Sequence, residues 1–159
     1  MDAKFFDPTR EEDDFKISID YHGQWFHDGA PIAREKLTQL FSTALHYDRD
    51  KQEYWLITPH EQGRIDVVDV PYIVIDFEWN DDLILKTNLD HTVTPNGDYP
   101  IYCDGDAPYI IIKNNVPARL NRSVRDKLID IALSQNGYDE GTKTLTLKAN
   151  GHDHIIAHS

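Results

Sequence analysis

The sequence carries an internal duplication, and this feature restricts the possible folds more than any other. A shift of 91 positions places residues 15–65 over residues 106–156 without a gap. Both segments then show two strand-like stretches, a helix, a Tyr-Asp pair and two further strand-like stretches in the same order. The identities are few, and they include Arg34/Arg125, Lys36/Lys127, Leu37/Leu128, Tyr47/Tyr138, Asp48/Asp139, Leu56/Leu147 and Ile65/Ile156. Because the ordered match is long and ungapped, we expect a doubled ββαββ unit and not a solenoid, whose repeats are shorter.

Residue patterns assign the elements of each copy. In the first copy, residues 15–20 alternate between apolar and polar side chains, a turn follows at residues 21–24, and residues 25–27 complete a β-hairpin. Pro31 then opens a helix that we expect to end near Tyr47, and Asn121 is a suitable N-cap for the second helix. Apolar residues recur on one face of each helix, which predicts that these faces are buried: Leu37, Leu40, Phe41 and Leu45 in the first, and Leu128, Ile131 and Ala132 in the second.

Between the copies lies an insertion rich in strand-forming residues. The pattern predicts strands at residues 72–79 and 83–88, with shorter strands near Val93 and Ile101. The second lobe should therefore hold the larger antiparallel sheet. We predict an α+β protein with an acidic segment at residues 1–14, an N-terminal lobe at residues 15–69 and a C-terminal lobe at residues 70–159.

The charge of the chain restricts its partners. A formal net charge of -12 and an isoelectric point near 4.9 would repel a phosphate backbone, so we expect no polymeric nucleic acid partner. No stretch is apolar enough to span a bilayer, and residues 1–15 lack the pattern of a signal peptide. Cys103 is the one cysteine, which rules out an intramolecular disulfide. These features predict a cytoplasmic protein without a membrane partner.

The chain lacks the usual catalytic signatures. It contains no phosphate-binding loop, no dinucleotide-binding glycine pattern, no nucleophile elbow and no paired-histidine zinc helix. We interpret His152, His154 and His158 as exposed polar residues near the chain end, and Cys103 as a small buried apolar residue in a strand. We therefore predict no catalytic residue, no metal site and no cofactor.

Two arginines occupy positions from which a side chain can reach a groove. Arg64 begins a strand after a glycine turn, and Arg119 lies shortly before the second helix. The planar guanidinium group suits phosphate or carboxylate, because it can donate two parallel hydrogen bonds. The alternative for each arginine is a structural salt bridge.

Passages along nearly the whole chain carry a family resemblance. They are residues 23–32 with Arg34, residues 54–59 and 61–65, residues 69–72, residues 86–90, and residues 118–120 before the second helix. As a set in this order, they resemble a bacterial family called domain of unknown function 1285. Two positions depart from the family pattern: Ala30 replaces the serine that is usual before Pro31, and His91 replaces a second acidic residue after Asp90.

The resemblance implies a duplicated core whose second lobe is superficially like a pleckstrin-homology domain. It also implies a site at the lobe interface for a nucleotide-like molecule, with a role in signal transduction and a signalling protein as partner. In that site, Arg64 and Arg119 would hold an anion, Thr87, Asn88 and Asp90 would contact a ribose or a base edge, and Tyr109 would stack on a base. The alternative for Asn88 and Asp90 is ordinary turn chemistry after a strand.

Two other functions stay open at this stage. One is an interaction or dimerisation adaptor without a small-molecule site, which a large exposed apolar patch would favour. The other is a hydrolase that uses Glu61 or Asp90 with His60 or His91, which a cleft with a strongly perturbed carboxylate would favour. The primary prediction is a ligand-binding or sensory module.

Overall fold

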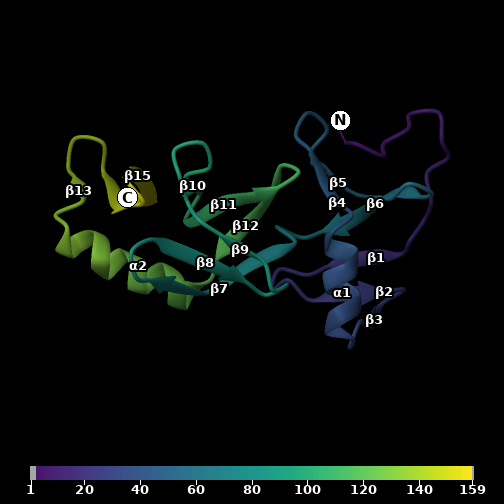
Figure 1. The fold of residues 1–159 in the computed structure, drawn as a ribbon, viewed down its shortest axis with the longest axis horizontal. Helices are drawn as coiled ribbons and strands as arrows, with labels where there is room; N and C mark the ends of the chain where they lie inside the picture. The colour runs from purple at the N-terminus through teal and green to yellow at the C-terminus, as the bar shows by residue number, and fades with distance from the viewer. Residues whose placement is uncertain (1–2, 159) are drawn as a thin grey trace. The chain divides into compact units, whose positions relative to one another are not determined.

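The computed structural model describes residues 3–158, and strands make up most of its regular structure (Figure 1). Two helices accompany two six-stranded sheets and one three-stranded sheet in this part of the chain, which confirms the α+β class. The chain divides into two units. Unit 1 runs up to Pro71 and includes Ile112–Val116, and unit 2 holds Tyr72–Ile111 and the chain from Pro117 onward. Neither helix in the described range is long and apolar enough to cross a membrane.

Unit 1 is a six-stranded sheet with one helix. Its elements are β1 (Ile17–Ile19), β2 (Trp25–His27), β3 (Ala30–Pro31), α1 (Glu35–Ser42), β4 (Leu45–Asp48), β5 (Glu53–Ile57) and β6 (Gln62–Val67). The strand order is β3-β2-β1-β6-β5-β4, and all neighbours run antiparallel except β1 and β6, which are parallel. The core of this unit is formed by Ile17, Ile19, Trp25, Leu45, Trp55, Leu56, Ile57 and Ile65.

Helix α1 differs from the prediction in length and in orientation. It spans eight residues, from Glu35 to Ser42, so Leu45 belongs to strand β4, where it is buried. Leu37 and Leu40 are 37% and 63% exposed, whereas Thr38 and Ser42 are buried. The predicted burial of Leu37 and Leu40 is therefore wrong.

The inward position of Thr38 and Ser42 has a physical explanation. Their hydroxyls donate to the backbone carbonyls of Glu35 at 2.8 Å and Gln39 at 2.6 Å, so burial leaves neither hydroxyl without a partner. The ring of Phe41 stacks on Trp25 of β2, with 6.3 Å between the ring centroids.

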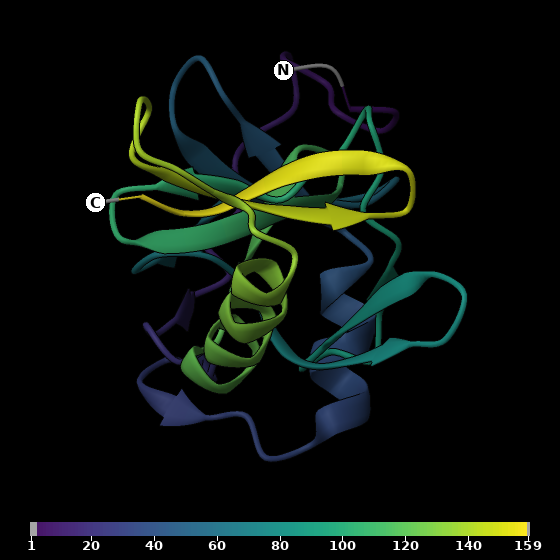
Figure 2. The same cartoon turned by 90° about the vertical axis from the view of Figure 1, so that its left-hand side faces the viewer.

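Unit 2 contains the insertion and most of the second copy. Its elements are β7 (Tyr72–Trp79), β8 (Leu83–Thr87), β9 (Thr92–Val93), β10 (Tyr102–Asp104), β11 (Ala107–Lys113), β12 (Val116–Leu120), α2 (Arg122–Ser134), β13 (Tyr138–Asp139), β14 (Thr144–Ala149) and β15 (His152–His158). The tip of the β11–β12 hairpin belongs to unit 1. Figure 2 shows α2 lying beneath strands β14 and β15, and Leu128 and Ala132 of this helix are buried as predicted, while Ile131 is half-buried.

The sheets of unit 2 differ from the single antiparallel sheet that the sequence predicts. One sheet has the order β10-β11-β12-β7-β8-β9, and β12 pairs with β7 in parallel. Strands β13, β14 and β15 form a separate antiparallel sheet. In unit 1 the last strand of the copy, β6, pairs with β1 of the β1–β2 hairpin. In unit 2 the inserted strand β7 takes this place and pairs with β12 of the β11–β12 hairpin. The insertion therefore separates two parts of the repeat that are joined in the first copy.

The duplication is confirmed at the offset of 91. Strands β1, β2, β4, β5 and β6 and helix α1 fall on β11, β12, β13, β14, β15 and α2. Strand register also repeats: Tyr47 pairs with Tyr54 as Tyr138 pairs with Leu145, and Leu56 pairs with Gly63 as Leu147 pairs with His154. Strand β3 has no counterpart. Asn121, at the position equivalent to Ala30 of β3, caps α2 instead, and its side chain accepts a hydrogen bond from the Val124 amide at 2.9 Å.

Candidate functional site

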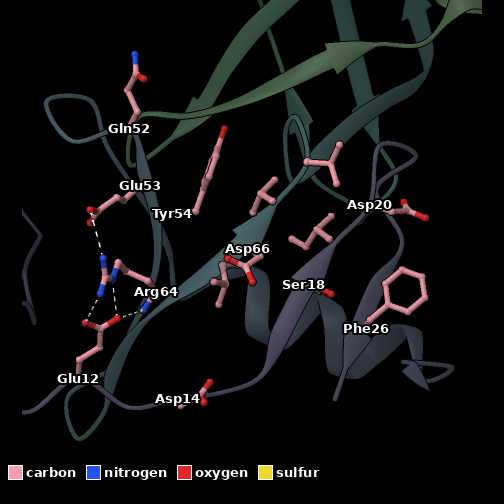
Figure 3. A pocket seen from close by; sticks show the side chains of 14 residues that line it. Glu12, Asp14, Ser18, Asp20, Phe26, Gln52, Glu53, Tyr54, Arg64 and Asp66 are labelled. Atoms are coloured by element: carbon pink, nitrogen blue, oxygen red, sulfur yellow. Dashed lines mark hydrogen bonds and ion pairs between the residues drawn. The ribbon is translucent and has the colours of Figure 1, made fainter. Parts of the chain in front are cut away.

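Arg64 lies on β6 of unit 1, in a cleft of about 720 Å³ (Figure 3). Its guanidinium group donates to both carboxylate oxygens of Glu12, from Nε to Oε1 at 2.7 Å and from Nη2 to Oε2 at 3.0 Å. A Glu53 oxygen lies 3.5 Å from Nη1, and the guanidinium carbon lies 5.9 Å from the centroid of the Trp55 ring. The Arg64 side chain is thus already engaged by two carboxylates and an aromatic ring.

The electrostatics of this cleft oppose anion binding. Arg64 is the single cation among its lining residues, and the lining carboxylates are Glu12, Asp14, Asp20, Glu53 and Asp66. The hydrogen bond from Arg64 lowers the pKa of Glu12, and the same bond raises the pKa of Arg64. A phosphate would have to displace Glu12 and would then face the remaining carboxylates.

The acidic segment that carries Glu12 is anchored by Gln62, a buried residue at the start of β6. The side-chain nitrogen of Gln62 donates to the Asp7 carbonyl at 2.7 Å. Its side-chain oxygen accepts from the Asp7 backbone amide at 3.0 Å and from Arg10 Nη2 at 2.9 Å. Arg10 Nη1 also donates to the Pro59 carbonyl at 2.8 Å. A Cβ atom at Gly63 would collide with the Asp13 carbonyl oxygen, so glycine is needed where the segment crosses β6. Sequence reasoning missed this anchor, whose one signal is an arginine within an acidic run.

The other predicted site residues belong to unit 2, and the polar ones at the end of β8 make structural bonds there. The Thr87 hydroxyl accepts from the amides of Leu89 at 3.3 Å and His91 at 3.2 Å, and Thr87 is buried. The Asn88 side chain accepts from the Ile73 amide at 2.9 Å. Asp90 is exposed and has a positive φ of 61°. These contacts correspond to the turn chemistry that the sequence left open as an alternative.

Arg119 and Tyr109 lie on the β11–β12 hairpin. Arg119 is buried in β12, where it is the register partner of Ile73 on β7. The Tyr109 ring stacks on Tyr102 of the neighbouring strand, with 6.0 Å between centroids. Arg64 therefore belongs to unit 1 and the other five predicted residues to unit 2, so neither unit by itself brings all six together.

The residue pairs of the hydrolase alternative also have clear positions. Glu61 and His60 are both exposed in the turn between β5 and β6. The His91 ring meets the Tyr72 ring edge to face, with 5.4 Å between centroids. Among residues 3–158, no group of three or more histidine, cysteine, aspartate or glutamate residues is arranged to hold a metal ion.

A second cavity in unit 1, of about 590 Å³, has a different chemistry. Its wall is formed mainly by apolar side chains: Phe15, Ile17, Ala30, Pro31, Ile32, Leu37, Phe41, Ala44 and Leu56, with His27, Thr58 and Glu61 as the polar members. Leu37 and Phe41 are one helical turn apart, so both point from α1 toward the same space. We call this cavity the apolar pocket.

Local sequence explains how the apolar pocket is built. Asp28 and Gly29 have positive φ angles of 51° and 83°, which turn the chain sharply between β2 and β3. Ile32 is held over this hairpin by a hydrogen bond from its amide to the Trp25 carbonyl at 2.9 Å. The stack of Phe41 on Trp25 fixes the opposite wall. The pocket thus lies between a short hairpin and the outward face of α1.

The polar rim of the apolar pocket is fixed by the turn from Thr58 to Glu61. The Thr58 hydroxyl accepts from the Glu61 amide at 2.9 Å and donates to the Glu61 carbonyl at 3.1 Å. The Thr58 amide also donates to the Glu61 carbonyl at 2.8 Å. Among residues 3–158, the Glu61 carboxylate has no hydrogen-bond or ion-pair partner, so it is available to a ligand.

Comparisons with known proteins identify the family. The family of domain of unknown function 1285 matches through its N-terminal domain at residues 4–70 and its C-terminal domain at residues 71–156. The crystal structure of a family protein from Silicibacter pomeroyi DSS-3 has a TM-score of 0.79 at 24% identity, and the match covers 99% of this chain and 90% of that one. For a family protein from Shewanella baltica OS155, the TM-score is 0.61 at 25% identity, with 72% and 91% covered. No curated protein matches the chain significantly. Family matches over both halves confirm the predicted resemblance, and the chain belongs to the family of domain of unknown function 1285.

Proposed function

We propose that this protein is a ligand-binding module whose site is the apolar pocket of unit 1. The observation that supports this most is the combination of a cavity of about 590 Å³ with a helix whose large apolar side chains face outward. Small-molecule sites are commonly cavities of roughly 300–1,000 Å³ with mostly apolar walls and a few polar groups. The expected ligand is a small molecule with an apolar body.

The orientation of α1 supports a binding site, because it lowers the stability of the free protein. Full burial of a leucine or phenylalanine side chain contributes about 1.5–3 kcal/mol, so a helix that turns Thr38 inward and leaves Leu37 at the pocket forgoes stability in the free protein. A ligand in the pocket would recover part of that energy by covering Leu37 and Phe41. The free energy of binding would thus come from surface that the fold leaves exposed.

The shape and lining of the pocket favour this ligand over the alternatives. An adaptor surface is usually a broad apolar patch, whereas the side chains here enclose a concave volume. A nucleotide would bring phosphate charge to a pocket that is lined by no lysine and no arginine. The nucleotide-like ligand, the role in signal transduction, the pleckstrin-homology-like second lobe and the cytoplasmic location remain predictions, and this proposal does not depend on them.

A neutral fluorescent dye, Nile red, tests the proposal. Wild-type protein should bind the dye with a blue shift of its emission, and Ala44→Phe should abolish binding because the added ring fills the pocket. Ala33→Phe is the matched control, since it places the same ring at an exposed position that does not line the pocket.

A measurement on wild-type protein covers the case in which Ala44→Phe fails to fold. Addition of the dye should shift the amide NMR signals of Ile32, Leu37 and Thr58 more than those of unit 2. If dye binding is equal in both phenylalanine variants, or if the shifts lie outside the pocket, the proposed site is incorrect.

A further inference from the structure

We propose that the ligand of the apolar pocket carries a primary ammonium group, or a similar cationic hydrogen-bond donor, next to its apolar body. This inference rests on the proposed function, because it names the chemistry of the molecule that the pocket would take. Its basis is the single carboxylate in the lining, Glu61, and the absence of a partner for this carboxylate among residues 3–158.

The charge of the lining selects against anions. Glu61 contributes a negative charge, and neither lysine nor arginine lines the pocket. The chain as a whole has a formal net charge of -12, so its field adds to the effect of Glu61. A fatty carboxylate would place a second anion beside Glu61 without a lysine or arginine to neutralise it, whereas an ammonium group would meet an unpaired carboxylate.

The backbone that carries Glu61 is fixed before any ligand arrives. On one side, the Thr58 hydroxyl and amide hold the Glu61 backbone through hydrogen bonds of 2.8–3.1 Å. On the other side, Gln62 is buried and bonded to Asp7 and Arg10. A ligand that binds Glu61 therefore has to order the exposed side chain of this residue but not its backbone.

The apolar part of the ligand has a separate set of contacts. Ile32, Leu37 and Phe41 line the pocket together with Glu61. A molecule with an aliphatic or aromatic body can therefore contact these side chains while its ammonium group donates to Glu61 at the rim. The recognised chemistry is that of a free aliphatic or aromatic amine.

Three compounds with the same chain length test this inference: octylamine, octanol and octanoate. Isothermal titration on the full chain should rank octylamine as the tightest and octanoate as the weakest. An ion pair at a partly exposed rim should make octylamine tighter than octanol by up to about fivefold. Glu61→Gln should remove most of this difference, because it should weaken octylamine binding more than octanol binding.

Glu140→Gln is the matched control, because it removes the same charge at an exposed position in unit 2 and should keep the preference for the amine. If all three compounds bind equally and Ala44→Phe abolishes them all, the pocket is a binding site but the inference about the ammonium group is wrong. If no compound binds, and Nile red binding is insensitive to Ala44→Phe, the proposed function itself fails. Binding of an amphipathic basic peptide in place of octylamine would assign the pocket to a protein partner and would also overturn the inference.

Discussion

The buried ring of His154 accepts a hydrogen bond from the backbone amide of Ile101, with 3.1 Å between Nδ1 and the amide nitrogen. Its Nε2 lies 3.1 Å from the Ala149 carbonyl oxygen. These contacts define a neutral ring with its proton on Nε2, since Nδ1 must offer a lone pair to Ile101. The ring thereby links β15 to the chain before β10 and to the end of β14. The sequence-based expectation that His154 is exposed is wrong, because both ring nitrogens find backbone partners in the interior.

The first prediction is that unit 2 loses stability in mild acid. Burial lowers the pKa of His154 below its unfolded value of about 6.5. The unfolded chain therefore binds the proton more readily, and stability is full above that value and falls as the pH drops below it. The loss attributable to one histidine is at most about 1.4 kcal/mol for each pH unit below the unfolded pKa. Urea unfolding at several pH values between 7.5 and 5.5 measures this loss of stability.

Two variants isolate the contribution of His154. His154→Gln should be less stable at every pH but should show a flatter dependence below pH 6.5. A residual slope is expected from His46, because burial also lowers the pKa of that ring. His22→Gln, at an exposed position, should keep the wild-type slope. An unchanged slope in His154→Gln would contradict the assignment.

The duplicated fold is predictable from the sequence because its signals are local. Alternation in residues 15–20, the glycine turns and the position of Asn121 each act within a few residues, so the order of elements and the offset of 91 follow from pattern alone. The pairing of β7 with β12 joins residues far apart in the chain. No local pattern specifies which strand an inserted hairpin will join.

The orientation of α1 and the candidate site lie beyond such patterns. Periodicity shows that Leu37, Leu40 and Phe41 share a side of the helix, but it does not tell which side meets the sheet. That choice depends on Thr38 and Ser42, whose hydroxyls can be buried because they donate hydrogen bonds to carbonyls of the same helix. Likewise, Arg64 pairs with Glu12 because the acidic segment is anchored on β6. The anchor is the bond between Arg10 and Gln62, which are 52 residues apart, so no local pattern reveals it.

The second prediction compares one leucine on each helix. Leu128→Ala should destabilise the protein by about 2–5 kcal/mol, because it removes a fully buried side chain. Leu40→Ala should change the free energy of unfolding by less than about 0.5 kcal/mol, because Leu40 is 63% exposed. Denaturant unfolding of both variants measures the contrast. Equal losses would mean that α1 packs through Leu40 after all.

The third prediction concerns the anchor of the acidic segment. Gln62→Ala should cost about 1–3 kcal/mol, since the Asp7 amide and an Arg10 donor lose their buried acceptor. The segment before Phe15 should also become more susceptible to limited proteolysis. Gln39→Ala, at a half-exposed position on α1, serves as the control and should change neither property. A Gln62→Ala protein with wild-type stability and cleavage would show that the segment is held by other contacts.

The last prediction decides between the apolar pocket and the nucleotide site that the sequence suggests. Arg64 is 53% exposed in its side chain and paired with Glu12 at 2.7 Å, so Arg64→Ala should lower the melting temperature only slightly. Because the surrounding carboxylates oppose phosphate, we expect that no nucleotide in a panel of mono-, di- and triphosphates raises the melting temperature in an Arg64-dependent way.

Glu12→Gln sharpens the test, since it removes the carboxylate that competes most strongly with phosphate for the Arg64 guanidinium. If nucleotides stabilise Glu12→Gln but not wild type, Glu12 is what excludes them. A nucleotide that stabilises wild type and loses this effect in Arg64→Ala would instead support the site predicted from the sequence, because ligand at about 100 times its dissociation constant adds roughly 2.7 kcal/mol to stability, a shift that thermal unfolding readily detects.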